Sequence, residues 1–164
     1  MDVTVVGKDP RAEAIGKLLT AGGYRVQFAG GAPAREGAPS SDVVLLAASR
    51  ASVRDGSLRV APDAILIDAM DGRATLESER ALAEAAGSRR IVRALIVLPQ
   101  AGANVLLCSD DPDAMLEIKN IFHRCGCVPT DRGPLTNLSE LEPPNPVLDD
   151  QFDTLKDMNT VTDR

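Results

Sequence analysis

The stretch VTVVGKDPRAEAIGKLL, from Val3 to Leu19, joins a strand pattern to a helix pattern across one glycine. Four strand-type residues lead into Gly7, and Ala12, Ile15 and Leu19 then recur at the spacing of one helix face. A strand followed at once by a helix is the opening unit of a parallel α/β sheet. In such a unit the helix N-terminus faces ligands bound at the carboxyl end of the strand.

The same alternation of strand and helix patterns continues along the chain. Strands are expected at Val3–Val6, Tyr24–Phe28, Asp42–Ala47, Ala64–Ala69, Ile91–Val97, Asn104–Cys108 and Cys127–Thr130. Their continuous apolar runs indicate burial on both faces, as in a parallel sheet. The sequence therefore predicts the α/β class, with a single Rossmann-like, doubly wound, mostly parallel sheet flanked by helices.

The helices between these strands have clear end signals. The first stops at the Gly22-Gly23 pair, and another is expected over Leu76–Ala86. A helix over Pro112–Arg124 has Asp111 as its cap and proline in its first turn.

The chain is expected to divide into a Rossmann-like domain over residues 1–146 and a polar C-terminal tail over residues 147–164. The tail follows a proline-rich stretch and is acidic, which is typical of a flexible arm or of a segment bound by a partner. Gly30–Ser41 is rich in Gly, Pro and Ala, so it is expected to replace or shorten the helix between the second and third strands.

The composition argues against several classes of partner. Hydrophobic residues make up 44% of the 164 residues but aromatic residues only 2%, so platforms for base stacking are scarce. The net charge of −6 leaves no basic excess for a nucleic-acid backbone. No run approaches the roughly 20 apolar residues that span a bilayer, no secretion signal is recognised, and three cysteines give no disulfide framework. We therefore expect a cytoplasmic protein that binds neither nucleic acid nor membrane.

The last third of the chain carries the most specific motifs, IVRALIVLP followed by NVLLCSDDPDAMLEIKNIFHRCGCVPTDRGPLTNLSELEP. This stretch resembles the NADP-dependent reductases of the deazaflavin coenzyme F-420 and the related cytosolic domain of six-transmembrane metalloreductases. Motifs of that family are V-V-K-A-F-N, V-x-V-C-G-D-D-x-E-A and D-x-G-P-L-x-N-A-x-x-L-E. The residues in register are Arg93, Ala94, Cys108, Asp110, Asp111, Ala114, Asp131, Gly133, Pro134, Leu135, Asn137, Leu141 and Glu142.

The resemblance implies NADP bound over the first strand–helix turn, hydride transfer to a flavin-like partner, and dimers that pair through the C-terminal part. It also marks where this chain differs. The family's first turn reads G-G-T-G-x-x-G-x-G, of which only Gly7 remains in this register. The other special positions hold Lys8, Asp9, Pro10, Glu13 and Ile15.

Asp9 is expected to cap the first helix, with Pro10 in its first turn. Its carboxylate would then accept the N–H groups that meet a phosphate in dinucleotide-binding folds. Lys8 and Arg11 offset this negative charge in part. Together with their acidic neighbours they form a charged cluster that is typical of solvated surface.

Two further positions of the resemblance have changed. The second strand ends in A-G-G, with Gly30 in the middle, where the family has G-S-R for the 2′-phosphate of NADP. Arg35 is the candidate to reach back and replace that arginine. Leu95 and Ile96 stand for the last two residues of A-F-N, so the asparagine near the reactive ring is lost and the cleft gains apolar side chains.

Charged residues near the carboxyl ends of strands are the remaining candidates for a site. They are Asp68, Asp71, Arg50 and Arg73. Asp71 is the candidate acid or base because it lies on a loop over the expected cleft, although an Asp-Gly pair also commonly forms a turn. No metal is expected, because the His-x-Cys-x-Cys segment that begins at His123 lacks the spacing of a zinc knuckle.

Three functions stay open on the sequence alone. The favoured one is a relative of the deazaflavin reductases that has lost dinucleotide binding and binds a small, largely apolar molecule for non-redox chemistry such as cyclisation or isomerisation. It needs no cofactor, and its partners are the ligand and a second copy in a homodimer. The alternatives are a working NADP-dependent oxidoreductase with an atypical phosphate loop, and a non-catalytic binding or assembly module.

Overall fold

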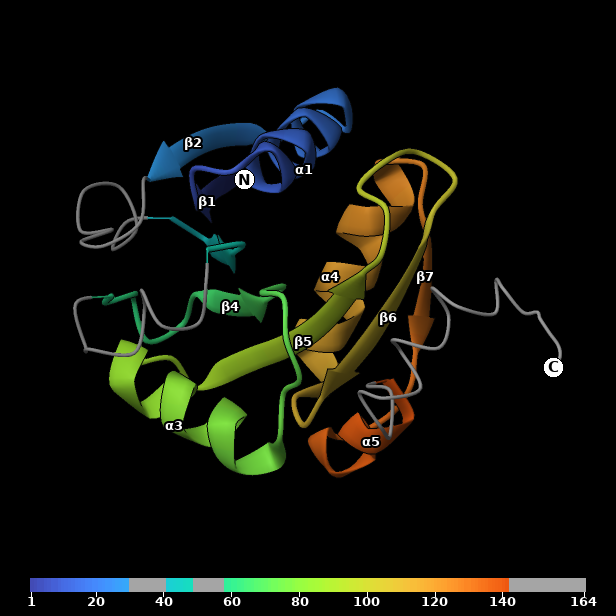
Figure 1. Cartoon of the computed structure of the whole chain (residues 1–164). Coiled ribbons are helices and arrows are strands. Elements are labelled where there is room, and N and C mark those ends of the chain that lie inside the picture. Colours follow the sequence, from blue (N-terminus) through green and yellow to red (C-terminus); the bar gives the residue numbers. More distant parts are fainter. Residues whose placement is uncertain (30–40, 49–57, 142–164) are drawn as a thin grey trace, which may run out of the picture.

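The computed structural model describes residues 1–29, 41–48 and 58–141. In these ranges the chain forms one seven-stranded sheet with helices on both faces (Figure 1). The strands are β1 (Asp2–Val6), β2 (Arg25–Ala29), β3 (Val43–Leu46), β4 (Ile65–Asp68), β5 (Arg90–Ile96), β6 (Asn104–Ser109) and β7 (Val128–Asp131). The helical elements are α1 (Pro10–Ala21), α3 (Leu76–Ala86), α4 (Pro112–Arg124), the 3-10 turn η2 (Leu135–Asn137) and α5 (Leu138–Leu141).

The strand order is β2-β1-β3-β4-β5-β6-β7. Every neighbouring pair is parallel except β5 and β6, which form an antiparallel hairpin. The predicted α/β, Rossmann-like, mostly parallel sheet is therefore confirmed. Each predicted strand is present, and its bounds differ from the expected ones by no more than a residue.

The order of the strands reverses at β1. The chain passes from β1 to β2 on one side, and then crosses to β3 on the other side of β1. The N-terminus of α1 stands beside the carboxyl end of β1, at this switch point. Doubly wound sheets bind their ligands in the crevice at such a point, which makes this edge the first place to search for a site.

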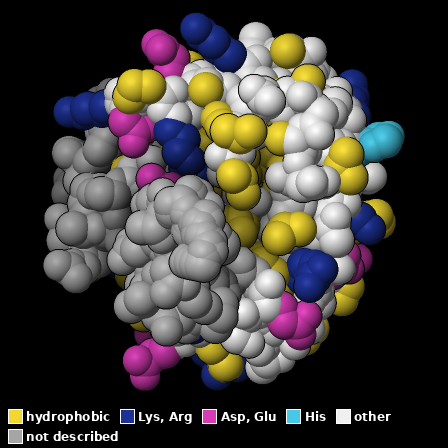
Figure 2. Space-filling model, turned by 45° about the vertical axis from the view of Figure 1, so that its right-hand side comes forward, with side chains coloured by type: hydrophobic (Ala, Val, Ile, Leu, Met, Phe, Trp, Pro, Cys, Tyr) yellow, Lys and Arg dark blue, Asp and Glu magenta, His cyan; other side chains and the backbone are white. Residues whose placement is uncertain are grey.

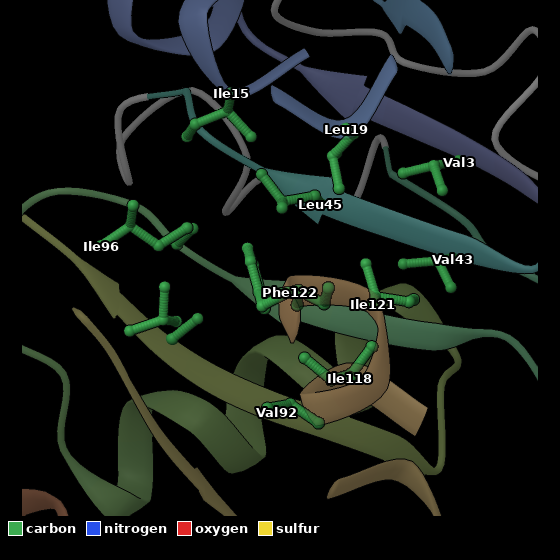
Figure 3. Packing of buried hydrophobic residues seen from close by; sticks show 14 of the residues in the cluster. Val3, Ile15, Leu19, Val43, Leu45, Val92, Ile96, Ile118, Ile121 and Phe122 are labelled. Atoms are coloured by element: carbon green, nitrogen blue, oxygen red, sulfur yellow. The ribbon is translucent and has the colours of Figure 1, made fainter. Parts of the chain in front are cut away.

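Two hydrophobic cores hold the layers together. On one face α1 and α4 pack on the sheet, where Ile15 and Phe122 meet Leu45 of β3 within the same cluster (Figure 3). On the other face α3, η2 and α5 pack on the sheet, with Leu82 and Leu138 among the buried side chains. Among the described helices, none has both the length and the apolar character needed to cross a membrane.

Candidate functional site

The turn between β1 and α1 is closely packed around Gly7. Its φ is 152°, and a Cβ atom at this position would lie 2.8 Å from the Cβ of Ala12 and 3.2 Å from the carbonyl carbon of Ala47. This close approach of strand and helix explains why the first and third positions of a G-x-G-x-x-G/A turn hold glycine or alanine. The structure therefore places Ala12 at the third position, which alignment to the longer family motif missed, and Asp9 at the middle one.

The carboxylate of Asp9 caps α1, as predicted. Its Oδ1 accepts a hydrogen bond from the backbone N–H of Ala12 at 2.8 Å, and Pro10 is the first residue of the helix. The positive end of α1 therefore carries a negative charge supplied by the chain itself. Lys8 is exposed beside it and makes no ion pair within the described part of the chain.

Arg11 crosses the carboxyl edge of the sheet, which corrects the expectation of a solvated surface cluster. Its Nη1 donates to the carbonyl of Ala69 at 2.7 Å, and its Nη2 donates to the carbonyl of Ile96 at 3.2 Å. Its Nε lies 3.7 Å from Oδ1 of Asp71. The side chain is only 20% exposed, whereas that of Asp71 is 84% exposed. Arg11 thus links the first turn of α1 to the ends of β4 and β5.

A buried ion pair lies beneath this edge. Arg93 of β5 and Asp68 of β4 are 1% and 0% exposed, and Nη1 of Arg93 is 3.3 Å from Oδ1 of Asp68. The same guanidinium donates to the carbonyls of Met70, at 2.9 Å, and Gly72, at 3.1 Å. Since Asp68 also accepts from the N–H of Met70, the loop that carries Asp71 is fixed from below.

The sequence contained a signal for this pair, although the prediction missed it. An arginine inside the otherwise apolar strand pattern IVRALIV needs an acidic partner if the strand is buried. Asp68 ends the neighbouring strand of the sheet. Only the strand order, however, brings these two residues together.

The side chain of Ile96 does not line a cleft, which corrects the expectation from the sequence. It is 2% exposed and belongs to the core under α1 and α4, where it points into the same layer as Leu45 (Figure 3). Its backbone carbonyl, not its side chain, faces Arg11. Leu95 is half-buried against the opposite core. The exposed apolar side chains at this end of β5 are Val97 and Leu98, at 70% and 55%.

The remaining predicted residues either make no hydrogen bond or ion pair with Arg11 or lie outside the described residues. Arg73 is exposed and lines a hollow of about 280 Å³ beside the N-terminus of α3. A second hollow of about 540 Å³ lies between α3 and the start of α4. Gly30, Arg35, Arg50 and the 147–164 tail fall outside the described residues.

The cysteines belong to the two cores. Cys125 and Cys127 are buried in the core with α1 and α4, whereas Cys108 is buried on the opposite face of the sheet. Burial, with a smaller contribution from Cys127, raises the pKa of the Cys125 thiol to about 11, although the charge of Arg124 acts in the opposite direction. Within the described ranges, no three His, Cys, Asp or Glu side chains gather as a metal site would require.

Comparison with solved structures supports the fold. An imine reductase from Myxococcus stipitatus, a variant in complex with NAD+, superposes with a TM-score of 0.74 at 17% identity, covering 94% of this chain and 60% of that one. A reductive aminase from Aspergillus terreus, in complex with NADPH and ethyl levulinate, gives 0.67 at 13% identity, covering 92% and 61%. This chain thus spans about three fifths of these reductases, and it has the Rossmann-type fold of their matching part.

A hypothetical protein from Sinorhizobium meliloti matches over most of both chains. Its TM-score is 0.67 at 18% identity, and the match covers 84% of this chain and 87% of that one. No protein-family model and no curated protein sequence matches the chain. At these identities the likeness shows the Rossmann-type fold alone, and the function has to be argued from the site.

Proposed function

We propose that this chain is a reductase-type Rossmann domain, related to the deazaflavin reductases, that has lost conventional dinucleotide binding and binds a small, largely apolar molecule at the carboxyl edge of its sheet. The observation that carries the proposal is Arg11, whose guanidinium is hydrogen-bonded to the ends of both β4 and β5. It occupies the edge along which a dinucleotide would extend from α1.

The cap of α1 supports the same proposal. A pyrophosphate at the N-terminus of α1 would meet the Asp9 carboxylate, which already accepts the N–H of Ala12. The middle position of the turn is a glycine in dinucleotide sites because a side chain there keeps the phosphate from the backbone. Here that side chain is also anionic, so both shape and charge oppose a phosphate.

Non-redox chemistry at this edge, such as cyclisation or isomerisation, would depend on Asp71. It is the acidic side chain paired with Arg11, and it is exposed to a bound ligand. A carboxylate beside a fixed guanidinium can take up or release a proton of a ligand held within hydrogen-bond reach.

A second candidate is a working NAD(P)H-dependent oxidoreductase with an atypical phosphate loop. Gly7 and Ala12 favour it, because they retain the close packing of the first and third positions of a dinucleotide turn. Lys8 is an exposed cation next to the same turn. The structures of reductases from Myxococcus and Aspergillus contain NAD+ or NADPH.

Calorimetric titration of the full chain with NADPH and with NADP⁺ separates the two candidates. The proposal expects no binding heat and no thermal shift up to millimolar cofactor. A micromolar Kd for either cofactor would refute it and restore the reductase.

The Asp9→Gly variant tests the stated cause. Removing the carboxylate should let pyrophosphate bind α1, with a gain of about 0.3–2 kcal/mol. Asp111→Gly is the matched control, because Asp111 caps α4 in the same way, accepting from Ala114 with Pro112 at the first helical position. If the two variants gain equally, pyrophosphate binds any uncapped helix start and the β1–α1 turn is not a phosphate site; if Asp9→Gly gains nothing, the Asp9 carboxylate is not what excludes the phosphate.

A further inference from the structure

The guanidinium of Arg11 is held in one orientation while part of it stays available. Two of its N–H donors bind the carbonyls of Ala69 and Ile96. Ala69 directly follows β4, and Ile96 is the last residue of β5. A guanidinium has five N–H donors, so three are left over. The side chain retains 20% exposure, so Arg11 is not closed off from solvent.

Asp71 stands beside these donors but does not bond them. The 3.7 Å between Nε of Arg11 and Oδ1 of Asp71 is longer than a hydrogen bond. The Asp71 side chain is 84% exposed, so solvent screens the pair. A carboxylate from a ligand can therefore approach the same donors more closely than Asp71 does.

The geometry around Arg11 is fixed in advance of binding. Arg93 donates to the carbonyls of Met70 and Gly72, on either side of Asp71. Arg11 itself is bonded to the residue after β4 and to the last residue of β5. A receptor held in this way loses little conformational freedom when its ligand binds.

Two apolar side chains are exposed directly after the strand end that holds the guanidinium. Val97 and Leu98 directly follow Ile96, whose carbonyl holds Arg11, and they are 70% and 55% exposed. From Val97 to Cys108 the sequence contains no charged residue. Figure 2 shows hydrophobic side chains reaching the surface together on the face that it presents.

We infer that Arg11 binds the carboxylate of a small apolar monocarboxylic acid, and that this carboxylate lies on the side of the guanidinium that Asp71 faces. The inference rests on the proposed function, because a dinucleotide would compete for the same edge. A planar guanidinium with parallel donors matches a carboxylate, and the hydrocarbon part of the acid lies against Val97 and Leu98. A phosphate carries more negative charge than a carboxylate, so Asp9 and Asp71 repel a phosphate more strongly, and a carboxylate is the better match.

Hexanoate is the probe, titrated into the full chain with amide chemical shifts as the readout. Hexanoate should shift the amides of Asp71, Val97 and Leu98 with a millimolar Kd, whereas methyl hexanoate, which lacks the charge, should not. Arg11→Lys keeps the charge but loses the fork of donors, and should weaken binding about fivefold or more.

The Asp71→Asn variant gives the most specific test. Removing the competing carboxylate should tighten hexanoate binding about two- to fivefold, the range that an exposed ion pair provides. Asp63→Asn is the matched control, because Asp63 is 91% exposed and pairs with Arg89 at 3.3 Å. It should leave the hexanoate Kd unchanged.

The outcomes separate this inference from the proposed function. If hexanoate binds neither the wild type nor Asp71→Asn, or if methyl hexanoate binds equally well, the carboxylate site is refuted. In that case a negative NADPH titration still leaves the loss of dinucleotide binding in place. If NADPH binds with a micromolar Kd and hexanoate does not weaken that binding, both the carboxylate site and the loss of dinucleotide binding are refuted.

Discussion

Replacing Arg93 with methionine should destabilise the fold severely. The substitution leaves the Asp68 carboxylate buried at 0% exposure without its guanidinium, and it frees the carbonyls of Met70 and Gly72. Removing one partner of a buried ion pair costs about 3–5 kcal/mol. A domain of this size is stable by about 5–15 kcal/mol in total, so the loss is a large fraction of the whole.

Urea and thermal unfolding measure this loss. For a chain of this length, 3–5 kcal/mol corresponds to a fall in Tm of about 6–20 °C. Arg90→Met is the control on the same strand, because Arg90 is only partly buried, at 24% exposure, and bonds Glu117 near the surface. Its loss should cost about 1 kcal/mol or less.

A double variant tests whether the buried Asp68 carboxylate, left without the Arg93 guanidinium, is the cause. Replacing Asp68 by leucine in the Arg93→Met background removes the buried carboxylate, so part of the lost stability should return. The reasoning is refuted if Arg93→Met costs no more than Arg90→Met, or if the double variant is less stable than Arg93→Met alone.

Two further predictions concern the first turn and the thiols. Gly7→Ala should lower the free energy of unfolding by about 1–3 kcal/mol, because the new Cβ would lie 2.8 Å from the Cβ of Ala12. Gly102→Ala is the control, because Gly102 has a φ of 88° and nothing lies within 4 Å of its Cβ position, so it should cost less. Equal losses of stability in thermal unfolding would contradict the role of the Ala12 contact. The Cys125 pKa rises from 9.0 to about 11 on folding, so its contribution to stability is complete below pH 9 and is lost as the pH rises towards 11. Urea midpoints across this range should fall less steeply for Cys125→Ala, and parallel curves would contradict the assignment.

Much of the fold could be predicted because its signals are local. The apolar runs of the strands, the Asp-Pro starts at Asp9 and Asp111 and the glycines after α1 each act within a few residues. Helix caps and strand burial depend on neighbouring side chains and backbone groups, so one sequence suffices to locate them. Element bounds were accordingly predicted to within a residue.

The candidate site was only partly predictable because it depends on contacts between distant residues. The sequence alone determined the fold class, the strand–helix order and the capping carboxylate of Asp9. Only the tertiary structure decided that Arg11 bonds Ala69 and Ile96, 58 and 85 positions further along the chain. It also decided that the Ile96 side chain is buried, since pleating sends it into the core while its carbonyl stays at the sheet edge. Strand order brings these groups together, and no local pattern encodes that order.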